Sequence, residues 1–329
     1  MKILIVTPVK RGSTKGNRIT AERYRSMLRG LGHRVTVAES YDPVYGNTSS
    51  QTSFDLLIAL HARRSSPSVL NFKQRFPCRP VIVVMTGTDL HWDMSRTRVV
   101  ETCLSNADQI VLLEPNGVSK LKKKFRDKST VIFQSSKRIQ SRPVKLKRRF
   151  EVSLLGHLRP VKDPFRTAMA ARLLPKESRI RIVHFGQALT PKMEQDAIEE
   201  SAQNPRYRWH GEVSHGVALR RLARSRLTVL SSKSEGGPAV VSEAIVNDVP
   251  ILATRIDATL GILGPNYPGL FEIGDTKKLA ELMHRAETEP EFLLELKSAM
   301  AKVRPKFLVS NEIKMWKSVL KAVSNCRLE

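Results

Sequence analysis

The segment from residue 227 to residue 243 reads LTVLSSKSEGGPAVVSE and contains the sharpest local signal in the chain. Its first residues are aliphatic and β-branched and predict a strand, the Gly-Gly pair predicts a loop, and the remainder predicts a helix. Pro238 suits the first helical position, where its missing N–H costs little. Exposed amides at such a helix start, together with the helix dipole, favour a phosphate group.

Two glutamates of this segment, Glu235 and Glu243, are eight residues apart. The first therefore lies in the loop and the second about two turns into the helix. Glu235 is suited to accept hydrogen bonds from sugar hydroxyls, and Glu243 from a ribose. An ordinary strand-to-helix turn with a glycine pair and two solvated glutamates is the alternative, and the segment alone leaves both interpretations open.

A second loop, Gly156 to Lys162, reads GHLRPVK and follows the predicted strand Phe150 to Leu155. It places two cations, Arg159 and Lys162, on a short turn. Two fixed cations neutralise a diphosphate and the charge that develops when the diphosphate departs. A surface turn in a basic protein is the alternative interpretation.

Short β-rich runs alternate with helical patterns along the rest of the chain, and several are apolar on consecutive residues. Such runs are typical of parallel strands that helices cover on both faces. The sequence therefore predicts an α/β protein with two doubly wound parallel sheets. The predicted strands are Lys2–Thr7, Arg34–Ala38, Asp55–Leu60, Pro80–Met85, Gln109–Leu113 and Thr130–Phe133 in the first half, and Phe150–Leu155, Ile180–Phe185, Leu227–Ser231 and Pro250–Ala253 in the second.

The length of 329 residues favours two domains, because one core rarely organises so long a chain. The segment from Lys137 to Arg149 holds seven basic residues and one proline, without helical or strand periodicity, and is predicted to be an exposed linker. We assign residues 1–149 to an N-terminal domain and residues 150–310 to a C-terminal domain. Residues 311–329 form a predicted amphipathic helix that must pack on one of them.

The formal net charge is +25, and residues 1–149 carry +19 of it. Nucleic acid, an anionic membrane surface or small phosphorylated substrates would each explain this imbalance, as would a basic surface that only aids solubility. No aromatic-basic RNA motif occurs, so an RNA-binding protein is the weaker alternative and no specific nucleic-acid partner is expected.

Several other classes of protein are disfavoured. Cys78, Cys103 and Cys326 are widely spaced and predict neither a disulfide framework nor a metal site. The longest apolar runs are about five residues, far short of a membrane span. The N-terminal MKILIVT does not resemble a signal peptide, and we expect a cytoplasmic protein. No HExxH, Asp-x-Asp, GxSxG, Walker A or GxGxxG motif occurs, so we expect no cofactor and no essential divalent metal.

The two loops together, G-x-x-R-x-x-K and then E-x-x-x-x-x-x-x-E, resemble the nucleotide-sugar domain of retaining GT-B glycosyltransferases. The resemblance implies two Rossmann-like domains that face each other across a cleft, and a terminal helix that packs back on the N-terminal domain. It implies that Arg159, Lys162 and the amides of Gly236 and Gly237 hold the diphosphate. The remaining donor residues that it implies are Gly156 in the first loop, Glu235 at the sugar, Glu243 at the ribose, and Gly186, Gly211 and Val213 at the base.

Nearly the whole chain is similar to the selenosugar synthases of selenoneine biosynthesis, a small glycosyltransferase-related family. The stretches that carry this resemblance are residues 8–20, 60–65, 86–90, 156–165 and 204–209. Members of that family join selenophosphate to UDP-N-acetylglucosamine or UDP-glucose and release UDP and phosphate. The resemblance therefore implies a UDP-sugar and selenophosphate as the partners of this chain, with a conventional transferase that uses a hydroxyl acceptor as the alternative.

A compact anionic acceptor needs cations, and several basic residues lie on loops at the predicted strand ends of the first domain. The expected selenophosphate residues are Gly16, Asn17, Arg18, Thr20, His61, Arg63, Arg64, Thr86 and Thr88. Because selenophosphate is already anionic, the attack needs no strong base. We expect His61 and Asp89 to handle a proton when phosphate is lost, in addition to Arg159, Lys162 and Glu235 as catalytic residues. A local turn around Thr86, Thr88 and Asp89 is the alternative for those three.

Overall fold

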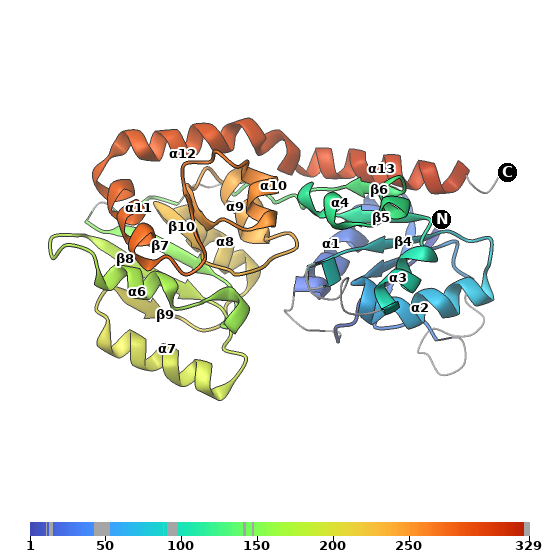
Figure 1. The fold of residues 1–329 in the computed structure, drawn as a ribbon, viewed down its shortest axis with the longest axis horizontal. Coiled ribbons are helices and arrows are strands. Elements are labelled where there is room, and N and C mark those ends of the chain that lie inside the picture. Colours follow the sequence, from blue (N-terminus) through green and yellow to red (C-terminus); the bar gives the residue numbers. More distant parts are fainter. Residues whose placement is uncertain are drawn as a thin grey trace. The chain divides into compact units, whose positions relative to one another are not determined.

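The computed structural model describes residues 1–10, 12, 16–42, 53–87, 89–90, 98–140, 143–146 and 148–325 (Figure 1). The chain divides into two compact units. Unit 1 comprises Met1–Phe133 together with the residues from Glu312 onward, and unit 2 comprises Gln134–Asn311. Within the described residues, no helix is long and apolar enough to cross a membrane.

Unit 1 alternates parallel strands with helices. Its elements are β1 (Lys2–Val6), α1 (Gly16–Gly30), β2 (Arg34–Ala38), β3 (Leu56–Leu60), α2 (Ala62–Arg75), β4 (Val81–Val84), α3 (Arg98–Ser105), β5 (Gln109–Leu112), α4 (Asn116–Lys120), α5 (Lys123–Arg126), β6 (Ser129–Val131) and most of α13 (Val309–Asn325). The described strands lie in the order β2-β1-β3-β4-β5-β6, and all of their pairings are parallel.

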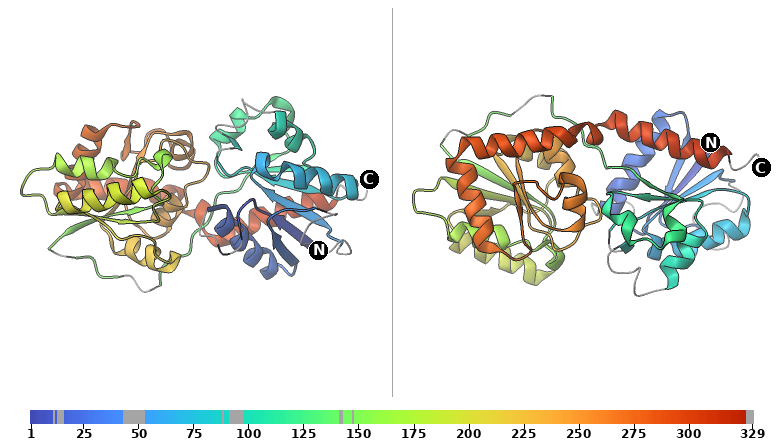
Figure 2. Two further views of the ribbon diagram at one scale, coloured as in Figure 1. Left: turned by 90° about the horizontal axis from the view of Figure 1, so that it is seen from below. Right: turned by 45° about the horizontal axis from the view of Figure 1, so that its top comes forward.

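Helices cover both faces of this sheet, which explains its apolar strands. On one face, Leu57 and Val83 pack with Phe72 of α2 and Cys103 of α3. On the other face, α1 and α13 pack together, and Figure 2 shows α13 lying along the sheet of unit 1. The residues that α13 contributes to this core are Trp316, Val319, Leu320 and Val323.

Unit 2 repeats the alternation. Its elements are β7 (Phe150–Leu155), η2 (Pro160–Lys162), α6 (Arg166–Arg172), β8 (Ile180–Phe185), α7 (Pro191–Gln203), β9 (Tyr207–Trp209), α8 (His215–Arg224), β10 (Leu227–Leu230), α9 (Ala239–Val246), β11 (Ile251–Thr254), α10 (Asp257–Leu263), β12 (Leu270–Phe271), α11 (Thr276–Thr288), α12 (Pro290–Val303) and η3 (Arg304–Phe307). The described strands lie in the order β12-β11-β10-β7-β8-β9, again all parallel.

The fold class predicted from the sequence is confirmed: each unit is a doubly wound parallel α/β sheet. The strands β2, β7 and β8 have the predicted boundaries, and the other predicted strands shift by one or two residues at an end. The sequence analysis missed β9 and β12, because runs of two or three residues carry no readable periodicity.

Residues 134–149 group with unit 2, whereas the sequence analysis placed them in the N-terminal domain. Hydrogen bonds account for this grouping. The Ser136 amide donates to the Phe307 carbonyl at 3.2 Å, and the Ile139 amide donates to the Asn247 side chain at 2.9 Å. Arg138 also pairs with Asp248 at 3.1 Å. A basic, aperiodic segment gives no sign of such distant partners.

Candidate functional site

The strand order of unit 2 brings the two sequence-predicted loops together. Strands β7 and β10 are neighbours, with Val152 opposite Leu227, while β8 and β9 lie on one side of this pair and β11 and β12 on the other. Open α/β sheets bind ligands at the carboxyl ends of the strands where the order reverses in this way. The loops Gly156–Lys162 and Ser231–Glu243 both begin at that point.

Lys162 and Glu235 form an ion pair between these two loops, although they are 73 residues apart in sequence. The Ser232 hydroxyl donates to the same Glu235 oxygen at 2.6 Å. The two charged side chains are 27% and 13% exposed, so both are partly withdrawn from water. The cation and the carboxylate both lie at the carboxyl ends of the strands and are largely withdrawn from water. Together they can hold a phosphate and a sugar hydroxyl.

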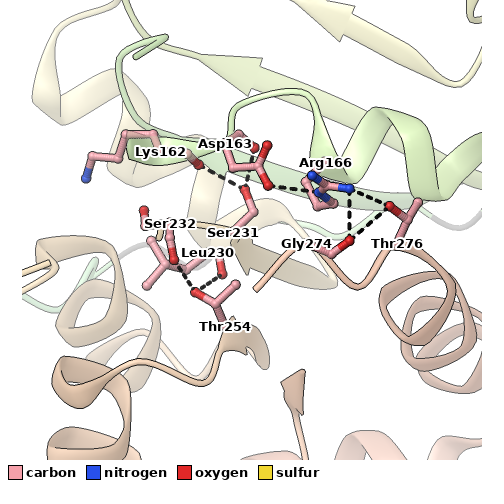
Figure 3. Close-up of polar contacts among 9 residues, drawn as sticks. All are labelled: Lys162, Asp163, Arg166, Leu230, Ser231, Ser232, Thr254, Gly274 and Thr276. Atoms are coloured by element: carbon pink, nitrogen blue, oxygen red, sulfur yellow. Dashed lines mark hydrogen bonds and ion pairs between the residues drawn. The ribbon is translucent and has the colours of Figure 1, made fainter. Parts of the chain in front are cut away.

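The backbone of the Lys162 turn is fastened to the end of β10, as Figure 3 shows. The Ser231 hydroxyl donates to the carbonyl of Asp163 at 2.9 Å and to that of Lys162 at 3.2 Å. The Lys233 amide donates to the Val161 carbonyl at 2.8 Å. The two loops are therefore one hydrogen-bonded body rather than two adjacent surface turns.

The remaining residues of these loops flank the ion pair. Half-buried Arg159 precedes the short helix η2 (Pro160–Lys162), and its carbonyl accepts from the Lys162 amide at 2.9 Å. Gly236 is buried and Gly237 half-buried between Glu235 and α9. The sequence analysis expected Pro238 to be the first helical residue of α9. In the structure it is the N-cap residue, one position earlier.

Glu243 lies in α9, and its Oε1 atom accepts a hydrogen bond from Nε2 of His215 at 2.7 Å. The Glu243 side chain is 10% exposed, whereas that of His215 is 60% exposed. His215 is the first residue of helix α8, which follows the segment Gly211–Ser214. The structure thus joins the expected ribose residue to the segment expected at the base.

Three glycines expected in the donor site meet at the ends of β7, β8 and β9. The Gly186 amide donates to the Gly211 carbonyl at 2.8 Å, and a Cβ atom on Gly186 would lie 1.9 Å from the Gly156 carbonyl oxygen. Only glycine permits so close an approach of two backbones. Val213 is half-buried two residues beyond Gly211.

His184 supports this meeting point from within the sheet. Its Nε2 atom donates to the Gly156 carbonyl at 3.1 Å, and its Nδ1 atom accepts from the Tyr207 hydroxyl at 2.8 Å. This tautomer follows because a carbonyl oxygen can only accept. Burial lowers the pKa of His184 to about 4, opposed by its hydrogen bond to the Gly156 backbone, and the ring is neutral at pH 7.

Most of the expected acceptor residues of unit 1 also follow strands at which the strand order reverses. Strands β1 and β3 are neighbours, β2 lies beyond β1, and the remaining described strands lie beyond β3. Helix α1 begins at Gly16 after β1, and α2 begins at Ala62 after β3. The residues Gly16 to Thr20 and His61 to Arg64 thus follow the two strands at this point.

Their exposure and partners differ. Gly16, Arg63 and Arg64 are exposed, Asn17 and Thr86 are half-buried, and Thr20 is buried. The Arg18 side chain is only 8% exposed and pairs with Glu22 at 2.5 Å, one turn along α1. Arg18 is therefore charge-compensated within its own helix, which the sequence analysis overlooked although the i, i+4 spacing is visible in the sequence.

His61 and Asp89 hold the backbone around the start of α2. His61 is the N-cap residue at a left-handed φ of 70°, and its Nδ1 atom accepts from the Arg64 amide at 3.5 Å. Asp89 is fully buried, and its carboxylate accepts from the amides of Ala62 at 2.9 Å and Gly87 at 2.8 Å. These contacts fit the local-turn alternative, in which the Asp89 carboxylate accepts from nearby backbone amides. The expected role of Asp89 in handling a proton stays a prediction.

Thr88, an expected acceptor residue, lies outside the described residues, as do the loop cations Arg11 and Lys15. Among the residues that the structure describes, no three His, Cys, Asp or Glu side chains gather as metal ligands.

The sequence analysis did not anticipate Ser231, Ser232, Asp163, Arg166 or His215 as parts of this region. Ser231 ends the predicted strand Leu227–Ser231 and Ser232 follows it, so both already lie beside the loop, which is a readable signal. The pairing of His215 with Glu243 and that of Arg166 with Gly274 had no such signal, because the partners are 28 and 108 residues apart in sequence.

The family model described as "Glycosyl transferases group 1" matches residues 135–303, which include every strand of the unit 2 sheet. The chain belongs to this family of glycosyltransferases. The two loops that form the candidate donor site both lie within the matched segment. No curated protein matches the sequence at a significant level.

Several solved structures have the same fold at low sequence identity. Anabaena HepE in complex with UDP-glucose is 15% identical, with a TM-score of 0.74 over 99% of this chain and 100% of that chain. Sucrose-phosphate synthase from Thermosynechococcus elongatus is 14% identical, with a TM-score of 0.79 over 98% and 99% of the two chains. The TarM protein of S. aureus is 14% identical, with a TM-score of 0.65 over 80% of this chain and 55% of that chain. These likenesses show the GT-B architecture of two Rossmann-like domains.

Proposed function

We propose that this group 1 glycosyltransferase takes its sugar from a UDP-sugar, either UDP-N-acetylglucosamine or UDP-glucose, bound by unit 2. The observation that carries the proposal is the Lys162–Glu235 ion pair at the carboxyl ends of β7 and β10, where an open sheet binds nucleotides. The similar HepE structures hold UDP and UDP-glucose, which supports this choice of donor.

The proposed roles follow from chemistry and position. Arg159 and Lys162 neutralise the diphosphate as the bond to the sugar breaks, and the amides of Gly236 and Gly237 donate to it. Glu235 accepts from sugar hydroxyls, and Glu243 accepts from the ribose. Backbone groups of Gly186, Gly211 and Val213 contact the base.

For the acceptor, we propose selenophosphate, bound at the carboxyl ends of β1 and β3 in unit 1. Support comes from the resemblance to selenosugar synthases and from the exposed cations Arg63 and Arg64 in the first turn of α2. Guanidinium groups bind tetrahedral oxyanions in a bidentate manner. We give Arg63 and Arg64 the main role in charge neutralisation because both are exposed, whereas the Arg18 side chain is only 8% exposed.

In the proposed reaction, a selenium lone pair attacks the anomeric carbon while the bond from that carbon to the diphosphate oxygen breaks, and UDP leaves with the electron pair. Water then cleaves the Se–P bond, which releases phosphate and leaves a selenol on the sugar. The attacking selenium is anionic, so the first step requires no general base. The second step requires a proton on selenium, and His61 is the proposed side chain for this transfer.

The test is a product analysis by mass spectrometry with a panel of UDP-sugars, each incubated with and without selenophosphate. The proposal predicts a 1-selenosugar, UDP and phosphate in equal amounts, only when selenophosphate is present. Rapid transfer to a neutral sugar without any reaction of selenophosphate would replace the acceptor proposal with a conventional transferase. A failure of UDP to bind in calorimetry would overturn the donor proposal.

Arg63→Ala separates the two halves of the proposal. We expect the KM for selenophosphate to rise about tenfold, with little change in the KM for the UDP-sugar, because one charge-assisted contact to the acceptor is lost. Arg34→Ala is the matched control, since exposed Arg34 begins β2 at the opposite end of the strands. Equal effects of the two variants would exclude Arg63 from the acceptor site.

A further inference from the structure

Arg166, the first residue of α6, connects the Lys162 turn to a distant part of unit 2 (Figure 3). Its Nε atom donates to the Asp163 carboxylate at 2.8 Å. One terminal nitrogen donates to the Gly274 carbonyl at 2.9 Å and to the Thr276 hydroxyl at 2.7 Å. The guanidinium thus joins the segment before α6 to the loop that leads into α11, 108 residues later.

Asp163 links Arg166 to the candidate donor site. It follows Lys162 directly and has a left-handed backbone, with φ 45° and ψ 57°. A residue with a side chain pays about 1–2 kcal/mol for that conformation, so surrounding contacts must hold it. Two contacts do so: Arg166 binds its carboxylate, and Ser231 binds its carbonyl at 2.9 Å.

The direction in which Lys162 leaves the turn depends on this backbone. The Lys162 amino group lies on the opposite side of the turn from the Arg166 guanidinium in Figure 3. The Arg166 guanidinium is also engaged by three oxygens and is only 21% exposed. Arg166 therefore acts on the site through the backbone and not by contact with a ligand.

We propose that Arg166 is a positioning residue for nucleotide binding: through Asp163 it holds the left-handed turn that directs Lys162 at the diphosphate. This inference rests on the proposed function, because it assumes that Lys162 binds the diphosphate of the donor. It adds a residue outside the two loops, and it makes the geometry of the donor site depend on the loop from Gly274 to Thr276.

A double-mutant cycle with UDP as the probe tests the proposal in the full-length chain. Calorimetry gives the UDP Kd of the wild type, Arg166→Ala, Lys162→Ala and the double variant. We expect Arg166→Ala to weaken UDP binding about tenfold in the wild type and less than about twofold when Lys162 is already absent. A purely structural role predicts additive effects, because general loosening would weaken UDP binding in both backgrounds.

Two further variants keep the result interpretable. Asp163→Ala removes the carboxylate that Arg166 binds and places a residue that disfavours the left-handed backbone at this position, while Arg166 keeps its contacts to Gly274 and Thr276. It should weaken UDP binding in the same way. Arg172→Ala is the control, because Arg172 is the last residue of the same helix. The Arg172 side chain is 43% exposed and pairs with Glu200 at 2.8 Å. It should leave the UDP Kd unchanged.

The outcomes distinguish a failure of the positioning role of Arg166 from a failure of the donor proposal. UDP binding by the wild type with additive losses, or with no loss in Arg166→Ala and Asp163→Ala, overturns the positioning role and leaves the donor proposal standing. Absence of UDP binding by the wild type, or a Lys162→Ala variant that binds as the wild type does, overturns both.

Discussion

The backbone of Gly186 lies directly against that of Gly156, so that a Cβ atom on Gly186 would stand 1.9 Å from the Gly156 carbonyl oxygen. The same carbonyl accepts the hydrogen bond from Nε2 of His184. The ends of β7 and β8 are therefore in direct backbone contact beside the candidate donor site. A substitution that disturbs this contact should lower the free energy of unfolding.

Gly186→Ala should destabilise the protein by about 2–5 kcal/mol, because the methyl group must displace backbone atoms and not a flexible side chain. Thermal unfolding followed by circular dichroism measures the effect. The matched control is Gly216→Ala in α8, where the nearest atom to a new Cβ is the Arg220 guanidinium at 3.7 Å. That variant should be neutral or slightly stabilised; equal melting temperatures for the two variants would contradict the close approach.

The buried His184 predicts a loss of stability in mild acid. Its folded pKa of about 4 lies below the ordinary value of 6.5, so between these values the unfolded chain binds a proton that the folded chain does not. Folding stability therefore falls as pH decreases from about 6.5 to about 4, by on the order of 3 kcal/mol from this residue. Denaturant unfolding at pH 7 and pH 5 should show a smaller pH dependence in His184→Gln, and an identical dependence would rule out this contribution.

Trp316 predicts how strongly α13 stabilises unit 1. Its ring is fully buried and meets the Tyr24 ring edge-on, with centroids 4.8 Å apart. Trp316→Ala should cost about 3–5 kcal/mol, because the other core residues cannot refill the volume of an indole. Lys317→Ala, at the exposed neighbouring position, is the control. Native-state hydrogen exchange should show the loss in the strands of unit 1, and protection equal to that of the control would disprove it.

Substitutions of Lys162 and Glu235 should have different effects, one on UDP binding and the other on kcat. Lys162→Met should weaken UDP binding by about tenfold or more, because a diphosphate contact to a cation is lost. Glu235→Gln should bind UDP nearly as the wild type does but lower kcat, because Glu235 is proposed to contact the sugar and not the nucleotide. Exposed Lys233 provides the control variant Lys233→Ala. A Glu235→Gln variant with unchanged kcat would remove Glu235 from the sugar site.

Much of the fold and both donor loops could be predicted from the sequence, for a local reason. Strand β7 is buried over five consecutive residues, and burial alternates over the first four residues of β8. Neighbouring residues reveal both patterns, and glycines and prolines mark where such strands end. The pairing of Arg18 with Glu22 is equally local, because the two residues are four apart on one helix.

The tertiary structure alone decided which chain ends meet and what each polar group binds. Lys162 meets Glu235, His215 meets Glu243, and Arg166 meets Gly274 only because β10 inserts beside β7 and the later strands follow on that side. It also showed that the Asp89 carboxylate accepts from the amide of Ala62 in α2 and from that of Gly87 in its own loop. Residue patterns record burial within one element, whereas these contacts depend on strand order, which results from packing helices on both faces of a sheet.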